Sequence, residues 1–267
     1  MTPRSYLYVP ADQPKRLAGA AGRGADALIV DLEDAVPLAH KESARRAAAG
    51  YLSAERAWVR INAETPEEDV AAIVDRPGLL GVVVPKAEAR LLFEVDGLLA
   101  SRPGLPVVAL IETARGVRTL DAITTAPRVT RLGLGEADLA AELHLRPGPD
   151  RVELWPIRSA VVVASAAAGL QPPIGPVHTA VRDEEGLRRT TELLLRQGFR
   201  ARTAITPTQL PVVNEVFTPT AAEVREAREA LALLSAETGV AVDAAGRMVD
   251  RAVLRSATEI LARADTG

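Results

Sequence analysis

Cysteine is absent from this chain of 267 residues. Disulfide bonds, thiolate metal sites and a cysteine nucleophile are therefore excluded. Aromatic residues make up only 3% of the chain, and no window comes near the ~20 consecutive apolar residues that a membrane-spanning helix needs. The N-terminal stretch MTPRSYLYVPADQPKR holds no apolar run of signal-peptide length. We therefore expect a cytoplasmic protein without a membrane segment.

Neither sign of charge predominates. The chain has 32 Lys and Arg residues against 35 Asp and Glu residues, mixed along its length, and its net charge is −3. A nucleic-acid partner is not expected, because a polyanion-binding face needs clustered positive charge. The three histidines have no His or Cys neighbour at metal-ligand spacing, which argues against a zinc site. No G-x-S-x-G or P-loop motif occurs, so serine hydrolase and nucleotide triphosphatase functions lack support.

What the sequence does have is a series of short apolar runs rich in β-branched residues, each followed by a polar residue and a helix-like stretch. This alternation is typical of a parallel sheet built from strand–helix units. Eight such runs in a chain of this length predict a (β/α)8 TIM barrel. A doubly wound open sheet is the alternative, but no G-x-G-x-x-G motif follows the first run. The runs are SYLYVP (5–10), ALIVDLED (27–34), AWVRIN (57–62), GVVVPK (81–86), VVALIET (107–113), RLGLGEAD (131–138), IGPVHT (174–179) and ARTAITP (201–207).

We expect the barrel to occupy residues 1–220 and a C-terminal helical extension to occupy residues 221–267. The extension is interrupted over 238–253, where a short excursion with a turn is predicted. Residues 140–155, AAELHLRPGPDRVELW, are polar and contain proline and glycine, so they are predicted to form a loop over the pocket.

Polar residues follow the predicted strands at a regular interval. Asp34, Arg60, Lys86, Glu112 and Asp138 are each 26 residues apart, and each lies at or just beyond the carboxyl end of its strand. In a barrel all these ends meet on one face, where catalytic groups gather. The sequence therefore predicts a polar pocket at that face.

Carboxylates at two neighbouring strand ends suggest a metal site. Glu112 follows the strand of LIETARG, while Glu136 and Asp138 follow the next strand in GLGEADL. Two oxygen ligands, with room for water and substrate oxygens, suit Mg²⁺. The alternative for Asp138 is the N-cap of the following helix. Glu33 and Asp34 are candidates for holding metal-bound water, with helix capping again as the alternative.

Two basic residues complete the candidate site. The guanidinium of Arg60 matches a substrate carboxylate in a bidentate manner, although it could equally form an ion pair with Glu33 or Asp34. Lys86 could be a Schiff-base lysine on a barrel strand. If Mg²⁺ occupies the pocket, an ion-paired lysine is the better interpretation.

Several of these segments together resemble a known family. They are RSYLYVPADQPKRLAGA, GADALIVDLEDAVPLAHKESAR, VRIN, VVVPKAE, ALIETARG, ADLAAELH and NEVFTPTAAEVREA, in this order from about residue 4 to residue 262. In these motifs the chain resembles the citrate lyase β-subunit-like branch of the HpcH/HpaI aldolase family.

This resemblance implies a (β/α)8 barrel that assembles as a homotrimer or hexamer. It implies a lyase that cleaves or forms a carbon–carbon bond in citryl-, malyl- or citramalyl-CoA-like thioesters, with a 2-oxo acid (oxaloacetate, pyruvate or glyoxylate) and an acyl thioester as products. Mg²⁺ would be bound by Glu112 and Asp138, and Arg60 would hold the carboxylate of the oxo acid. Asp250, in the C-terminal segment GRMVDRAVLRSA, matches an acid/base residue that reaches a neighbouring subunit's site; a surface turn is the alternative.

The chain departs from the family pattern at three strand ends. The family has G-x-E-D-L after the sixth strand, whereas GEADL here places Ala137 beside Asp138 in the substrate-binding position where glutamate is expected. The seventh strand ends in IGPVHT without the usual aspartate. The eighth has Ala201-Arg202 in place of Gly-Lys, and Thr206-Pro207 in place of His-Pro or Asn-Pro. These positions are expected on the face that would meet CoA or an acyl carrier, so recognition of that part of the substrate is open.

Three functions remain as hypotheses. The first is a Mg²⁺-dependent carbon–carbon lyase with Arg60, Glu33, Asp34, Lys86 and Asp250 as catalytic candidates. The second is a thioester hydrolase on the same fold, or an aldolase acting on a free hydroxy acid. The third is a scaffold subunit of a larger lyase complex.

Overall fold

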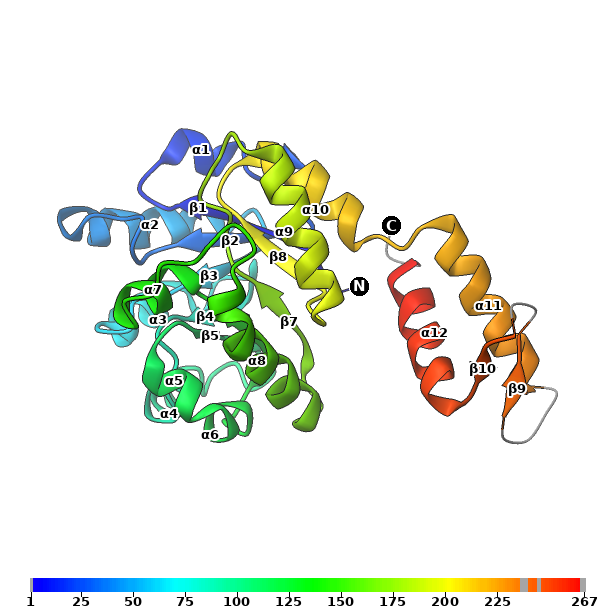
Figure 1. The fold of residues 1–267 in the computed structure, drawn as a ribbon. Coiled ribbons are helices and arrows are strands. Elements are labelled where there is room, and N and C mark those ends of the chain that lie inside the picture. Colours follow the sequence, from blue (N-terminus) through cyan, green and yellow to red (C-terminus); the bar gives the residue numbers. More distant parts are fainter. Residues whose placement is uncertain (1, 236–239, 244–245, 265–267) are drawn as a thin grey trace. The chain divides into compact units, whose positions relative to one another are not determined.

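Eight parallel strands close into a barrel in the computed structural model, which describes residues 2–235, 240–243 and 246–264 (Figure 1). Each strand pairs with its neighbour in sequence, and β1 also pairs with β8, so the sheet has no free edge. The predicted (β/α)8 barrel is confirmed. Its strands are β1 (Ser5–Pro10), β2 (Ala27–Asp31), β3 (Ala57–Arg60), β4 (Leu79–Val84), β5 (Val107–Ile111), β6 (Val129–Leu134), β7 (Gln171–Gly175) and β8 (Ala201–Ala204).

The seventh strand differs from the sequence prediction, because it begins three residues earlier than expected and ends at Gly175. Pro172 and Pro173 lack backbone donors, so a strand is not expected from the sequence at this position. The register between β6 and β7 is irregular there: Arg131 pairs with Gln171, but Gly133 pairs with Ile174.

Helices cover the outside of the barrel. They are α1 (Pro14–Ala18), α2 (Lys41–Tyr51), α3 (Pro66–Ile73), α4 (Ala89–Leu98), α5 (Ala114–Arg118), α6 (Leu120–Thr124), α7 (Glu136–Glu142), α8 (Trp155–Ala167), α9 (Glu184–Arg196) and α10 (Leu210–Phe217). The predicted loop over 140–155 is shorter than expected, because α7 continues to Glu142 and a 3-10 turn covers Val152–Leu154.

Strand residues alternate between two apolar clusters. Val30, Val59 and Val82 belong to the larger cluster, which the strands share with the surrounding helices. Ile29 and Val83 belong to a smaller cluster inside the barrel. Because successive strand residues point to opposite faces, the inward positions at the strand ends are the ones that open into the pocket.

The chain divides into two units, Pro3–Val213 and one that begins at Asn214. The second unit contains α11 (Ala221–Ser235), the two-residue strands β9 (Ala241–Val242) and β10 (Met248–Val249), and α12 (Arg251–Ala264). The antiparallel pair of strands lies where the sequence predicts an excursion, although residues 238–239 and 244–245 of that segment fall outside the described residues.

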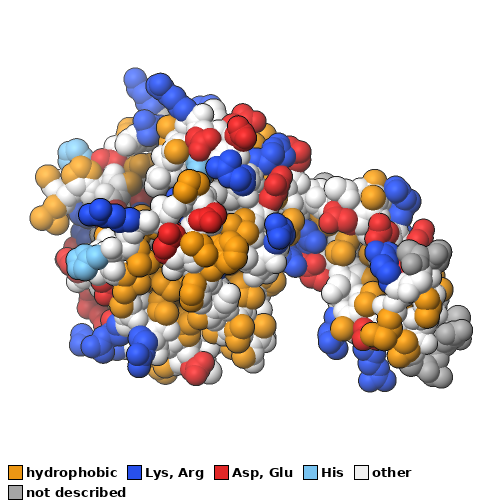
Figure 2. Space-filling model, viewed as in Figure 1, with side chains coloured by type: hydrophobic (Ala, Val, Ile, Leu, Met, Phe, Trp, Pro, Cys, Tyr) orange, Lys and Arg blue, Asp and Glu red, His pale blue; other side chains and the backbone are white. Residues whose placement is uncertain are grey.

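Among the described helices, none combines the length and apolar character needed to cross a membrane. On the face of the barrel unit seen in Figure 2, acidic and basic side chains are interspersed. This distribution agrees with the mixed charge pattern of the sequence.

Candidate functional site

Two buried carboxylates follow the second strand. Asp31 ends β2 and Glu33 lies two residues later, with only 1% and 4% of their surfaces exposed. Buried charges of this kind are costly unless they are paired. Their partner is Arg60 at the end of β3, which lies opposite Asp31 in the strand register.

Arg60 makes a bidentate ion pair with Asp31. Its Nε donates to Oδ1 at 2.7 Å and its Nη2 to Oδ2 at 2.6 Å, while Nη1 lies 2.9 Å from Oε2 of Glu33. Burial alone would lower the pKa of Arg60, but the hydrogen bonds and the charge of Asp31 raise it above its ordinary value. The ring of Tyr8 lies 4.8 Å below the guanidinium carbon. Arg60 is therefore a fixed cation.

The guanidinium still has donors for a ligand. Arginine carries five N–H donors, and these three contacts leave one on Nη1 and one on Nη2. The side chain as a whole is 12% exposed. A fixed fork with a free edge fits a carboxylate.

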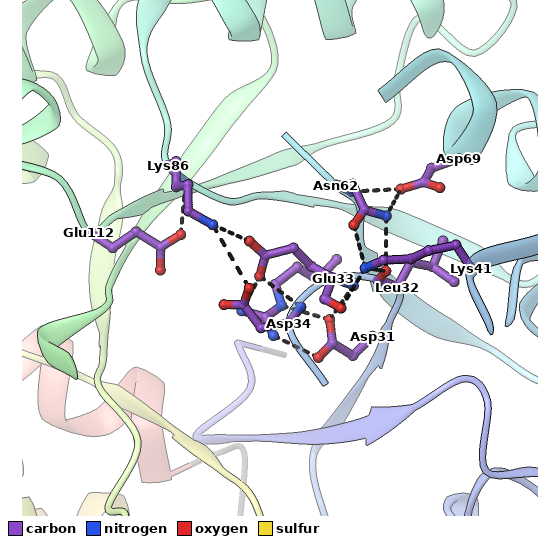
Figure 3. A network of polar contacts seen from close by, with 10 residues as sticks. Asp31, Leu32, Glu33, Asp34, Lys41, Asn62, Asp69, Lys86 and Glu112 are labelled. Carbon is purple, nitrogen blue, oxygen red and sulfur yellow. Dashed lines mark hydrogen bonds and ion pairs between the residues drawn. The ribbon is translucent and has the colours of Figure 1, made fainter. Parts of the chain in front are cut away.

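Lys86 joins Glu33 from the other side. Its Nζ lies 2.5 Å from Oε1 of Glu33 and 4.0 Å from Oδ1 of Asp34. Burial raises the pKa of Glu33 in spite of these two basic neighbours. Both oxygens of Glu33 are thus engaged, whereas Asp34 is 58% exposed. In the structure, Lys86 forms an ion pair with Glu33, as the ion-paired interpretation of this lysine expects (Figure 3).

Glu112 faces this group from the end of β5. Its Oε1 accepts a hydrogen bond of 2.8 Å from the main-chain N–H of Lys86, and the residue is 2% exposed. Burial raises the pKa of Glu112 to about 8; the Lys86 N–H opposes this rise, and the charges of Glu33 and Asp138 add to it. A buried carboxylate beside other negative charge is stabilised by a bound cation.

Gly135 makes room for that carboxylate. A Cβ at this position would lie 2.5 Å from Oε2 of Glu112 and 2.6 Å from its Cβ, both far inside van der Waals contact. The backbone at Gly135 has φ −106°, which any residue can adopt, so the requirement for glycine is steric.

Asp138 and Ala137 lie in the first turn of α7, and both are exposed. The N-cap of this helix is Gly135, so the capping alternative for Asp138 is wrong. Glu136 is not available as a metal ligand, because both of its carboxylate oxygens accept hydrogen bonds from Arg158. Nε donates to Oε1 at 2.5 Å and Nη2 to Oε2 at 3.0 Å, and Glu136 is only 3% exposed. The deep pair with Arg158 satisfies Glu136, which leaves Asp138 as the exposed carboxylate of the motif.

No group of three His, Asp or Glu side chains in metal-ligand arrangement occurs in the described part of the chain. The charge of Asp138 acts on Glu112, and a pair of carboxylates fits a metal that takes few protein ligands and keeps water or substrate in its other positions. Mg²⁺ has this preference, and an all-oxygen donor set matches it.

A second layer holds the loop after β2. The Nζ of Lys41 lies 2.7 Å from the carbonyl oxygens of Leu32 and Glu33 and 2.6 Å from Oδ1 of Asn62. Asn62 in turn donates to Leu32 and to the fully buried Asp69. These contacts, drawn in Figure 3, fix the backbone that carries Glu33.

Sequence reasoning missed several of these residues. The sequence pattern assigns Asp31 no role, although its place at the end of β2, opposite Arg60, could have identified the pair. Lys41 and Asn62 lie away from the strand ends in sequence, and no local pattern links them.

The eighth strand does not present Arg202 to the pocket. Arg202 is 2% exposed, and it donates to the side chains of Thr190 and Thr191 in α9 at 2.9 and 2.7 Å. Burial lowers its pKa to about 9. The expectation that Arg202 lies on the face that meets the acyl carrier is therefore wrong, because the residue occupies an outward position of β8.

Asp250 lies in the C-terminal unit, directly before α12. Its Oδ1 accepts hydrogen bonds from the backbone N–H groups of Ala252 and Val253 at 2.8 and 3.0 Å. This geometry is that of a helix N-cap. The residue as a whole is half-buried.

Substitution of Gly135 by alanine is expected to weaken Mg²⁺ binding by ~10-fold or more, because the added methyl group must displace the Glu112 carboxylate. Isothermal titration calorimetry measures this change. Gly97→Ala is the matched control, since a Cβ there meets nothing within 4 Å and should leave binding unchanged. Equal affinities for both variants would contradict the assignment of Glu112 as a ligand.

Comparison with known proteins places these residues in context. Residues 4–207 match the family model of HpcH/HpaI aldolase/citrate lyase. A (3S)-malyl-CoA thioesterase of Cereibacter sphaeroides (strain KD131 / KCTC 12085) is 36% identical over 275 residues, which cover 98% of this chain and 94% of that protein. The citrate lyase subunit beta of Leuconostoc mesenteroides subsp. cremoris is 32% identical, with 97% and 92% coverage.

A solved structure gives the same relationship. The crystal structure of CitE from Mycobacterium tuberculosis in complex with magnesium, acetoacetate and coenzyme A is similar to this chain with a TM-score of 0.82. The two sequences are 33% identical, and the alignment covers 98% of each chain.

Proposed function

The chain belongs to the HpcH/HpaI aldolase/citrate lyase family, and we propose that it is a Mg²⁺-dependent carbon–carbon lyase. Its substrate would be the acyl thioester of a hydroxy-dicarboxylate, cleaved to a 2-oxo acid and a shorter acyl thioester, or formed from them. The observation that carries this proposal is the buried carboxylate of Glu112, which lies near enough to the fixed guanidinium fork of Arg60 for their charges to interact.

The residues fit a cation on one side and an anion on the other. Glu112 and Asp138 would hold Mg²⁺, consistent with the magnesium in the related CitE structure. When bound, Mg²⁺ acts as a Lewis acid that favours carbonyl formation at the carbinol carbon. Arg60 would bind the carboxylate next to that carbon through its free Nη1 and Nη2 donors.

The reaction has three bond changes. The hydroxyl group loses its proton and becomes the carbonyl of the oxo acid as the carbon–carbon bond next to it breaks. The electron pair of that bond passes to the carbon α to the thioester carbonyl, as an enolate. A general acid then protonates that carbon. Arg60 neutralises the carboxylate of the part that becomes the oxo acid, while Asp31 and Glu33 keep the guanidinium in place.

The proton donors and acceptors are part of the proposal. Asp34 and the partly exposed ammonium of Lys86 lie at the rim, where they can move a proton. Asp250 would supply the acid for the enolate carbon from a neighbouring copy in a homotrimer or hexamer, as the family resemblance implies. Its free carboxylate oxygen is available for this, because Oδ1 alone caps α12.

A thioester hydrolase is the second candidate, and the 36% identity to a (3S)-malyl-CoA thioesterase favours it. In that reaction water attacks the thioester carbonyl, so free CoA and an intact hydroxy acid are released. An aldolase that acts on a free hydroxy acid would need no thioester at all.

Product analysis separates these reactions. Purified protein with Mg²⁺ and malyl-, citramalyl- or citryl-CoA is expected to release glyoxylate, pyruvate or oxaloacetate together with acetyl-CoA, measured by mass spectrometry. EDTA should abolish this release. Free CoA with unbroken hydroxy acid would select the hydrolase instead, and full activity in EDTA would contradict both metal-dependent functions.

A further inference from the structure

Lys86 has an unusual backbone. Its φ is +47°, in the left-handed region that non-glycine residues rarely adopt. It follows Pro85 in a tight turn after β4, at a position that turns commonly fill with glycine. Such strain persists only where the surrounding structure enforces it, and it is concentrated at functional sites.

The turn directs two successive N–H groups to the neighbouring strand. The N–H of Ala87 donates to the carbonyl oxygen of Leu110 at 3.1 Å, while the N–H of Lys86 donates to Oε1 of Glu112 at 2.8 Å. In an extended strand, successive N–H groups point to opposite sides. The left-handed conformation of Lys86 instead lets both donate to β5 and the residue that follows it.

On the other side of Glu112, Gly135 leaves space, since a Cβ there would lie 2.5 Å from Oε2. The carboxylate is therefore held at Oε1 by a directional donor, and the glycine keeps the surroundings of Oε2 clear. Within the described part of the chain, Oε2 accepts no hydrogen bond, so it is the oxygen free to bind a cation.

We propose that Lys86 is a positioning residue that acts on Glu112 through its main-chain N–H, and that its left-handed backbone selects the oxygen offered to the cation. The same residue reaches Glu33 with its Nζ at 2.5 Å. One turn thereby sets both the cation side and the anion side of the pocket. The inference rests on the proposed function in that Mg²⁺ is taken as the cation.

Two variants separate the backbone from the ammonium group. Lys86→Gly and Lys86→Val both lose the ammonium and both keep the N–H. Glycine accepts a positive φ, whereas β-branched valine resists it. Titration calorimetry with MgCl₂ is expected to give a Kd within about threefold of the wild-type value for Lys86→Gly and at least ~10-fold weaker for Lys86→Val. Equal Kd values for the two variants would overturn the proposal.

A measurement without metal tests the same contact. Amide hydrogen exchange at residue 86 is expected to be at least ~10-fold faster in Glu112→Ala than in the wild type, because the acceptor is removed. Exchange at Ala87, whose N–H is bonded to Leu110, is the internal control and should not change. Unchanged exchange at residue 86 would overturn the proposal even if Lys86→Val failed to fold.

These readouts distinguish the inference from the proposed function. Wild-type protein that binds no Mg²⁺ but shows the expected exchange pattern would refute the metal-dependent lyase and leave the Lys86–Glu112 contact intact. Wild-type protein that binds Mg²⁺, with both Lys86 variants binding alike, would refute the positioning role alone.

Discussion

Replacement of Glu112 by alanine is expected to remove measurable Mg²⁺ binding and to lower kcat/KM by at least ~10³-fold. The loss is large because Glu112 is the buried ligand of the proposed pair, and Asp138 alone leaves a single exposed carboxylate. Calorimetry and steady-state kinetics with the thioester substrate measure the two effects. Activity within tenfold of the wild-type value would contradict the assignment.

Glu112→Gln serves as the isosteric control, and in EDTA it should stabilise the fold. The pKa of Glu112 is raised by burial to about 8 from 4.5, so the native state favours its neutral form. This contribution to stability is complete below pH ~4.5 and is lost as the pH rises through ~8. We therefore expect Glu112→Gln to raise the free energy of unfolding by about 1–3 kcal/mol at pH 8.5, and by much less at pH 5.

The same pKa predicts how Mg²⁺ affinity depends on pH, because the proton and the cation compete for Glu112. Below pH ~8 the apparent affinity should fall towards tenfold per pH unit. An affinity that did not vary between pH 6 and pH 8 would show that Glu112 is ionised in the free protein or is not a ligand.

Arg60→Lys is expected to lower kcat/KM by ~10²–10³-fold while Mg²⁺ affinity stays within about threefold of the wild-type value. Lysine keeps the positive charge between Asp31 and Glu33, but it cannot bind Asp31 with a fork and still offer a bidentate edge to a substrate carboxylate. Kinetics in the condensation direction should show a raised KM for the 2-oxo acid.

Arg60→Met is the less informative variant, because it leaves Asp31 and Glu33 buried without the guanidinium. Loss of one partner of a buried pair costs about 3–5 kcal/mol, so this protein could lose activity by unfolding. The kinetic test is valid only if the melting temperature of Arg60→Lys is close to that of the wild type. Unchanged KM for the oxo acid in a folded Arg60→Lys protein would contradict carboxylate binding by Arg60.

The barrel was predictable because most strands are buried apolar runs with a polar residue at or just after their carboxyl ends. The interval of 26 residues from Asp34 to Asp138 already indicated one face where five polar side chains meet. The exception is β7. Pro172 and Pro173 are unfavourable in a strand, so the sequence pattern predicted both the start of this strand and its end at Gly175 wrongly.

The contacts within the site were less predictable, because they depend on side-chain direction. Sequence spacing alone could not tell that Glu136 turns to Arg158 and that Arg202 turns outward to α9. It also could not show that Lys86 uses its main-chain N–H, because a positive φ at a lysine has no sequence signature.

The most direct test of the site is a crystal soaked with Mn²⁺, which replaces Mg²⁺ and scatters anomalously, together with pyruvate or oxaloacetate. We expect an anomalous peak ~2.0–2.2 Å from one oxygen of Glu112 and from Asp138, and the oxo-acid carboxylate on the Nη1 and Nη2 edge of Arg60. A crystal whose only anomalous peak lies away from Glu112, with the oxo acid absent from Arg60, would contradict the account.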